Sequence, residues 1–136
     1  MQNNMQTKIA EWRETFSAFD DSMDLYQFLI DLGKDMQKDP LEEQYRLEEN
    51  RVSRCQYSLF VARPDNEYKA YSDGIIASGY SAVLLDIFNN SSTEEIATVD
   101  PMNVGEGLGI REILSGQRQN GFYQMMEVMK RHANHA

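Results

Sequence analysis

The chain has 136 residues, one cysteine and a formal net charge of −9. This length suits one domain spanning residues 1–136, with expected fraying at residues 1–5 and 134–136. A single cysteine excludes an internal disulfide, and a lone thiol without a recognisable secretion signal fits a reducing cytoplasm. The acidic balance and the absence of a basic stripe argue against nucleic acid as a partner, and no apolar run is long enough for a membrane span.

Two helices are predicted before residue 40. Residues 5–19 place four large apolar side chains at helical spacing, namely Ile9, Trp12, Phe16 and Phe19. The run Asp20-Asp21-Ser22 then offers N-caps for a second helix with a strong apolar stripe, which Lys38-Asp39-Pro40 ends.

The middle of the chain predicts a small antiparallel sheet. Residues 41–50 are charged and read as an irregular segment that exposes Glu48, Glu49 and Asn50. Residues 56–63 and 68–71 read as two strands joined by a turn at Pro64-Asp65-Asn66, and residues 51–53 as a third strand. Cys55 would therefore lie in or beside a link between strands.

The remaining segments predict helices packed on that sheet. A broad apolar face over residues 75–88 predicts a central helix, capped by Ser72 or Asp73, and Ser92 with Glu95 forms a capping box for a short one. The glycine-rich residues 104–109 read as a flexible link, and residues 115–121 introduce a C-terminal helix. The predicted class is α+β: a small antiparallel three-stranded sheet with helices packed on it.

Cys55 is the strongest candidate for chemistry. A thiolate can attack the outer sulfur of a persulfide, as in thiol–disulfide exchange, and a nearby cation would favour the thiolate. Arg51 would share the face of Cys55 in an extended chain but would lie further off. The competing interpretation is a buried, inert thiol, because free cysteine is among the most buried residue types. His132 and His135 read as a solvated tail, and the sequence predicts no metal site.

Four segments, in order, resemble motifs of the SufE family of sulfur acceptors. They extend over most of the chain, from about residue 20 to residue 133. In chain order they are Leu25-Tyr26-Gln27-Phe28-Leu29-Ile30-Asp31-Leu32-Gly33-Lys34, then Glu49-Asn50-Arg51-Val52 before Cys55-Gln56, then Tyr71-Ser72-Asp73-Gly74-Ile75-Ile76, and finally Leu114-Ser115-Gly116-Gln117-Arg118-Gln119-Asn120-Gly121.

The resemblance implies a fold like that of SufE and the IscU-type scaffold, and a function. Cys55 would accept a persulfide from a SufS-like cysteine desulfurase, stimulate that enzyme, and pass the sulfur to a SufBCD-like iron–sulfur scaffold. The supporting or partner-contacting residues would be Asn50, Arg51, Gln56, Asp73 and Arg118. The chain would be a carrier and activator rather than a stand-alone enzyme, a monomer or homodimer with no cofactor, since pyridoxal phosphate belongs to the desulfurase. We expect Cys55 to rest against apolar neighbours and to swing outward on docking.

Two departures from the family pattern motivate another hypothesis. Arg54 stands where the family has glycine, and Tyr57 replaces a small residue. They favour, as an alternative, a regulatory module that binds the desulfurase without transferring sulfur. An IscU-type cluster scaffold suits a single cysteine poorly, since clusters take several thiolates. A structural protein with a buried thiol is the remaining possibility.

Overall fold

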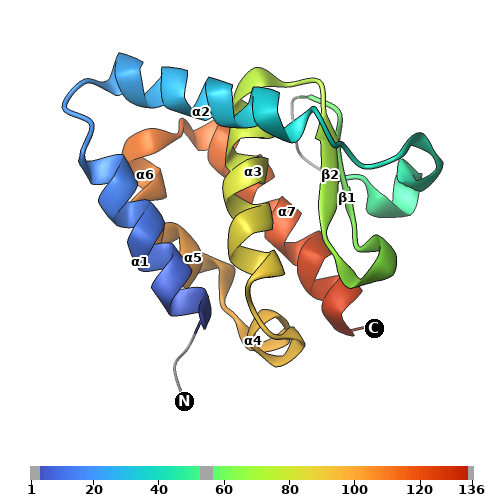
Figure 1. The fold of residues 1–136 in the computed structure, drawn as a ribbon. Helices are drawn as coiled ribbons and strands as arrows, with labels where there is room; N and C mark the ends of the chain where they lie inside the picture. The colour runs from blue at the N-terminus through green and yellow to red at the C-terminus, as the bar shows by residue number, and fades with distance from the viewer. Residues whose placement is uncertain (1–3, 53–56, 135–136) are drawn as a thin grey trace.

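A computed structural model describes residues 4–52 and 57–134, in which a short β-hairpin lies at one side of a group of helices (Figure 1). The α+β class is confirmed. In chain order the elements are α1 (Asn4–Ser17), α2 (Ser22–Met36), η1 (Glu43–Tyr45), η2 (Glu48–Asn50), β1 (Leu59–Ala62), η3 (Pro64–Asn66), β2 (Lys69–Ser72), α3 (Ile75–Asn89), α4 (Thr93–Thr98), α5 (Pro101–Leu108), α6 (Ile110–Ile113) and α7 (Gly116–Asn134).

The two N-terminal helices form as predicted. Asp21 caps α2, its side chain accepting a 2.8 Å hydrogen bond from the Met23 amide. The indole of Trp12 and the ring of Phe16 pack on Phe28 and so join α1 to α2. At the start of α1, Met5 is buried and its amide donates to a carboxylate in α4, so the helix is fastened at its first turn.

The sheet differs from the prediction. β1 and β2 pair antiparallel, with Leu59 opposite Ser72 and Ala62 opposite Lys69. Among the described residues no third strand joins them, since Arg51 forms only an isolated bridge with Phe60. Ser53, the expected end of the third strand, lies outside the described residues. The expected three-stranded sheet is therefore a two-stranded hairpin with one added bridge.

Helices α2 and α3 cross at very short range beside the hairpin. A Cβ added at Gly79 would stand well inside van der Waals distance of the Leu29 carbonyl oxygen, and one at Gly33 would meet Ser78 Cβ at 2.8 Å. Only a missing side chain on each helix permits this approach. This close crossing fixes the position of α2 relative to α3, and Figure 1 shows α2 passing over the top of α3.

The C-terminal half contains one confirmed cap and one wrong prediction. Ser92 and Glu95 form the expected capping box of α4. The glycine-rich residues 104–109 are not a flexible link, since they complete α5, and Gly109 ends that helix in the left-handed region with φ of 73°. Tyr123 packs against Gly105, where a side chain would clash, so tertiary packing offsets the poor helix propensity of glycine.

Helix α7 lies behind α3 and packs along β1 (Figure 1). Its inner face is buried and includes Phe122, Met125, Met126 and Met129. The hydroxyl of Tyr68 donates a 2.7 Å hydrogen bond to the Met129 carbonyl, and burial raises the pKa of this tyrosine to about 12. The end of α7 is thus fastened to the hairpin. Within residues 4–52 and 57–134, no helix has the length and apolar character to cross a membrane.

Candidate functional site

The segment that leads into Cys55 is held against β1. The Val52 amide donates a 2.8 Å hydrogen bond to the Leu59 carbonyl, and Val52 itself is buried. Arg51 bridges to Phe60, and its guanidinium lies 3.5 Å from the Glu48 carboxylate on the surface. This side of the cysteine-containing stretch is therefore anchored up to residue 52.

Asn50 is buried rather than exposed, which corrects the sequence prediction. Its side chain is only 6% accessible. The Asn50 amide nitrogen donates a 2.8 Å hydrogen bond to the Tyr45 carbonyl, and its oxygen lies 2.9 Å from Nε2 of His132. His132 belongs to α7 and is not part of a solvated tail, which is a second correction. Spacing could not reveal the pair, because 82 positions separate the two residues.

The chain that follows Cys55 is anchored by Asp73. Its carboxylate accepts a 2.9 Å hydrogen bond from the Ser58 amide, and its own amide donates to the Ser58 carbonyl at 3.2 Å. Neither Ser72 nor Asp73 caps α3 as predicted, since the N-cap is Gly74 and has no side chain to cap with. The Ser72 hydroxyl instead accepts from the Gly74 amide, so Asp73 remains available to Ser58.

An apolar pocket of about 520 Å³ opens beside this anchor. It is lined by Met23, Tyr26, Ile30, Tyr57, Asp73, Ile75, Ile76 and Arg118. Met23 is 73% exposed, Ile75 61% and Tyr57 44%, so large apolar side chains face solvent around it. Such a surface, with few polar groups, is typical of a binding site rather than of an inert exterior.

Arg118 supplies the positive charge of this pocket. Its guanidinium lies 5.9 Å from the centre of the Tyr26 ring, and the Tyr26 hydroxyl donates to the Ile113 carbonyl at 2.7 Å. The ring is therefore held from α6 while it presents one face to the cation. Asp73 and Arg118, which are 45 positions apart in the sequence, thus line one cavity.

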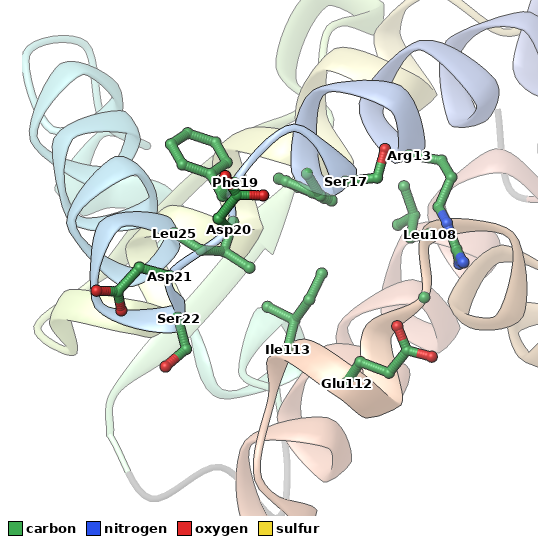
Figure 2. Close-up of a pocket in the computed structure, with 12 residues that line it drawn as sticks. Arg13, Ser17, Phe19, Asp20, Asp21, Ser22, Leu25, Leu108, Glu112 and Ile113 are labelled. Atoms are coloured by element: carbon green, nitrogen blue, oxygen red, sulfur yellow. The ribbon is translucent and has the colours of Figure 1, made fainter.

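A separate hollow of about 380 Å³ lies between α1, the start of α2 and the α5–α6 corner. Figure 2 shows Asp21 and Ser22 at one end of it and Arg13 and Glu112 at the other. It shares no lining residue with the pocket at Tyr57. Asp21 is engaged in capping α2, and none of the lining residues flanks Cys55 in the sequence. The candidate site is therefore the pocket beside Tyr57 and Asp73.

Cys55 and Gln56, the central residues of the predicted site, lie outside the described residues. The structure brings Asp73, Arg118 and Tyr57 together, whereas Asn50 and Arg51 lie on the other side of the stretch, next to α7 and η2. The part of the chain that is described contains no group of three His, Cys, Asp or Glu side chains suited to a metal ion.

Comparison with known proteins identifies the family. The model "SufE: Fe-S metabolism associated domain" matches residues 10–133. The chain belongs to the SufE family. An uncharacterized SufE-like protein of Rhizobium meliloti is 30% identical over 135 residues, which are 93% of this chain and 95% of that protein. The SufE-like protein 1, chloroplastic/mitochondrial, of Arabidopsis thaliana is 29% identical over 94% of this chain and 35% of its own length.

A solved structure shares the fold of the chain. A hypothetical protein from Thermus thermophilus, solved in solution, superposes with a TM-score of 0.72 at 18% identity, covering 95% of each chain. Membership of the family associates the chain with Fe–S metabolism and implies an interaction with a cysteine desulfurase.

Proposed function

We propose that this SufE-family protein accepts a persulfide sulfur on Cys55 from a cysteine desulfurase and passes it to an iron–sulfur assembly scaffold. The observation that carries the proposal is the paired anchoring of the stretch around Cys55. Val52 bonds to Leu59 on one side, and Ser58 bonds to Asp73 on the other. Both ends of a short segment that contains the only cysteine are thereby fixed, and the end at Ser58 is held by Asp73, which lines the apolar pocket.

The chemistry is a sulfur exchange without net oxidation. The Cys55 thiolate attacks the outer sulfur of the donor persulfide, a new S–S bond forms on Cys55, and the donor S–S bond breaks to release a thiolate. An unperturbed cysteine has a pKa of about 8.5, so only a small fraction is thiolate at neutral pH. Positioning the two sulfurs is then the main contribution that the proteins make to the rate.

The pocket suits a docking partner. Its exposed apolar side chains, Met23, Ile75 and Tyr57, would lose water on contact, and burial of such area favours association. Arg118 and Asp73 supply one charge of each sign at the same place. Opposed charges at an interface fix orientation more than they add affinity, so these two residues would set the angle at which the desulfurase approaches.

The proposed sulfur transfer also has implications for the cofactor, the cellular compartment and the supporting residues. Pyridoxal phosphate would be needed only in the desulfurase, so the chain would require no cofactor of its own. A reducing cytosol suits a lone nucleophilic thiol. Gln56, adjacent to Cys55 in the sequence, and Arg51 remain proposed supporting residues.

Desulfurase turnover tests the proposal. Sulfide release from cysteine by a SufS-like desulfurase is measured with the native protein, with Cys55→Ser and with Arg118→Glu. We expect stimulation by the native protein, none by Cys55→Ser, and at least a roughly tenfold higher concentration requirement for Arg118→Glu, since the charge of the docking surface is reversed. Arg111→Glu, an exposed arginine outside the pocket, is the matched control and should behave as the native protein does.

A second candidate function makes a different prediction in the same assay. Tyr57 stands at the end of the cysteine stretch and is 44% exposed in the pocket, so docking through this ring needs no thiol. A regulatory module of this kind would stimulate the desulfurase equally with serine at position 55. That result would replace sulfur transfer with regulation by binding.

A further inference from the structure

The side chain of Asn50 is fixed in one orientation by its two hydrogen bonds. The Tyr45 carbonyl can only accept, so the atom 2.8 Å from it must be the Asn50 amide nitrogen. The Asn50 oxygen therefore faces His132 at 2.9 Å, and an oxygen that accepts requires a proton on His132 Nε2. The histidine is a donor in this pair whatever its charge.

His132 can act as a fixed point because the end of α7 is itself held. Ala133 is buried, and the Tyr68 hydroxyl bonds to the carbonyl of Met129, one turn before His132. Tyr68 belongs to the hairpin that also receives the Val52 hydrogen bond at Leu59. Helix α7, the hairpin and residues 50–52 are thus joined by hydrogen bonds, and the His132–Asn50 bond links α7 to this approach two residues before its last described position.

Loss of the histidine donor would leave a buried amide oxygen without this partner. Asn50 is 6% accessible, so water cannot fully replace the bond. The nearby surface hollow is lined by Glu49, Asn50, Arg131 and His132, and its two charged residues, Glu49 and Arg131, are exposed. Loss of the bond would therefore loosen residues 50–52, the described part of the approach to Cys55.

We propose that His132 is a positioning residue for sulfur transfer, which acts by donating from Nε2 to Asn50 and so holding the approach to Cys55. The inference rests on the proposed function of Cys55, but it concerns a residue 77 positions away in the sequence, which is hydrogen-bonded to Asn50. It predicts that the rate of sulfur acceptance on Cys55 depends on the N–H donor at position 132, and not on the imidazole ring or its charge.

Three variants separate the donor from the ring. His132→Gln retains an N–H near the position of Nε2, His132→Leu removes it at similar volume, and Arg131→Gln is the matched control from the same hollow. The rate of persulfide formation on Cys55 is measured by mass spectrometry with a desulfurase and cysteine. We expect about a tenfold fall for His132→Leu and rates within about twofold of native for the other two. Equal rates for His132→Leu and the native protein, or equal losses for the leucine and glutamine variants, would overturn the proposal.

Two readouts do not depend on the desulfurase. Alkylation of Cys55 by iodoacetamide should be roughly threefold faster or more in His132→Leu and unchanged in His132→Gln, because we expect the thiol to rest against apolar neighbours and a loosened approach would release it from them. Slower transfer with faster alkylation distinguishes lost positioning from a general loss of sulfur chemistry. If the native protein accepts no sulfur, the proposed function of Cys55 is wrong. The alkylation rates then still show whether His132 holds the approach to Cys55.

Nitrogen-15 NMR of the native protein tests the bond without any variant, and so remains decisive if His132→Leu does not fold. We expect neutral His132 to carry its proton on Nε2. A neutral His132 with its proton on Nδ1 would contradict the hydrogen bond and with it the proposal.

Discussion

A methyl group added at Gly79 tests how the fold shapes the docking pocket. In Gly79→Ala the new Cβ meets the Leu29 carbonyl oxygen of α2, and backbone cannot rotate out of the way as a side chain can. Overpacking of this kind costs about 1–3 kcal/mol, and we take the upper end because the neighbour is backbone. Alanine in place of glycine within a helix returns about 1 kcal/mol, so the net loss is about 2 kcal/mol.

Urea unfolding measures this loss. With a slope of about 2 kcal/mol per molar, the midpoint should fall by about 1 M at an unchanged slope. Gly116→Ala is the matched control, because no atom lies within 4 Å of a Cβ at that position of α7. It should be neutral or gain up to about 1 kcal/mol. Equal midpoints for the two variants would refute the reasoning that the α2–α3 crossing depends on a missing side chain.

The same substitution has a consequence at the site. α2 carries Met23, Tyr26 and Ile30 of the pocket, whereas α3 carries Ile75 and Ile76. Separation of the two helices would widen the pocket and reduce contact with a docked partner. We therefore expect Gly79→Ala to raise the concentration needed to stimulate a desulfurase by more than the loss of folded protein explains.

Three further substitutions test single interactions. Asp73→Ala should destabilise the fold by about 1 kcal/mol in thermal unfolding and slow sulfur acceptance, because Ser58 loses its side-chain acceptor, whereas Asp73→Asn should retain most of both. Tyr68→Phe should cost about 1 kcal/mol at neutral pH through the lost bond to Met129. Because the pKa of Tyr68 is raised from 10 to about 12 in the folded protein, its contribution to stability is full below pH 10 and is lost as pH rises from 10 through about 12. The phenylalanine variant should therefore lose less stability than the native protein over that range. The hydrogen bond from the Ser92 amide lowers the pKa of Glu95, so the contribution of this carboxylate to stability is present above pH 4.5 and is lost as pH falls. The unfolding free energy of Glu95→Gln should therefore depend less on pH in acid than that of the native protein, and an equal dependence in both proteins would contradict this.

Local patterns predicted much of the fold. The Asp21 cap, the Ser92–Glu95 capping box and the apolar face of α3 depend on residues within a few positions of one another, and all three are present. Local patterns gave a wrong prediction where tertiary packing determines the secondary structure. Residues 104–108 lie in α5, where side chains of other helices occupy the space beside Gly105 and Gly107, and no local signal contains that information.

The candidate site shows the same division. Motif resemblance named both Asp73 and Arg118 as supporting residues, and the structure places them in the lining of one pocket. It gave no sign that Asn50 is buried, because its partner His132 lies on another helix. The sequence predicted three strands, whereas the described residues form two, for a similar reason. Periodicity identifies extended chain, but whether Arg51 extends a strand or forms a single bridge depends on its pairing with Phe60.

The central claim is that Cys55 carries the sulfur. The most direct measurement is the mass of the Cys55 peptide, isolated without reductant after one turnover with a cysteine desulfurase and cysteine, beside a sample that received no cysteine. We predict one added sulfur atom on that peptide, which dithiothreitol removes and Cys55→Ser lacks. An unmodified Cys55 peptide, recovered while the desulfurase is turning over and the two proteins are bound, would contradict the account.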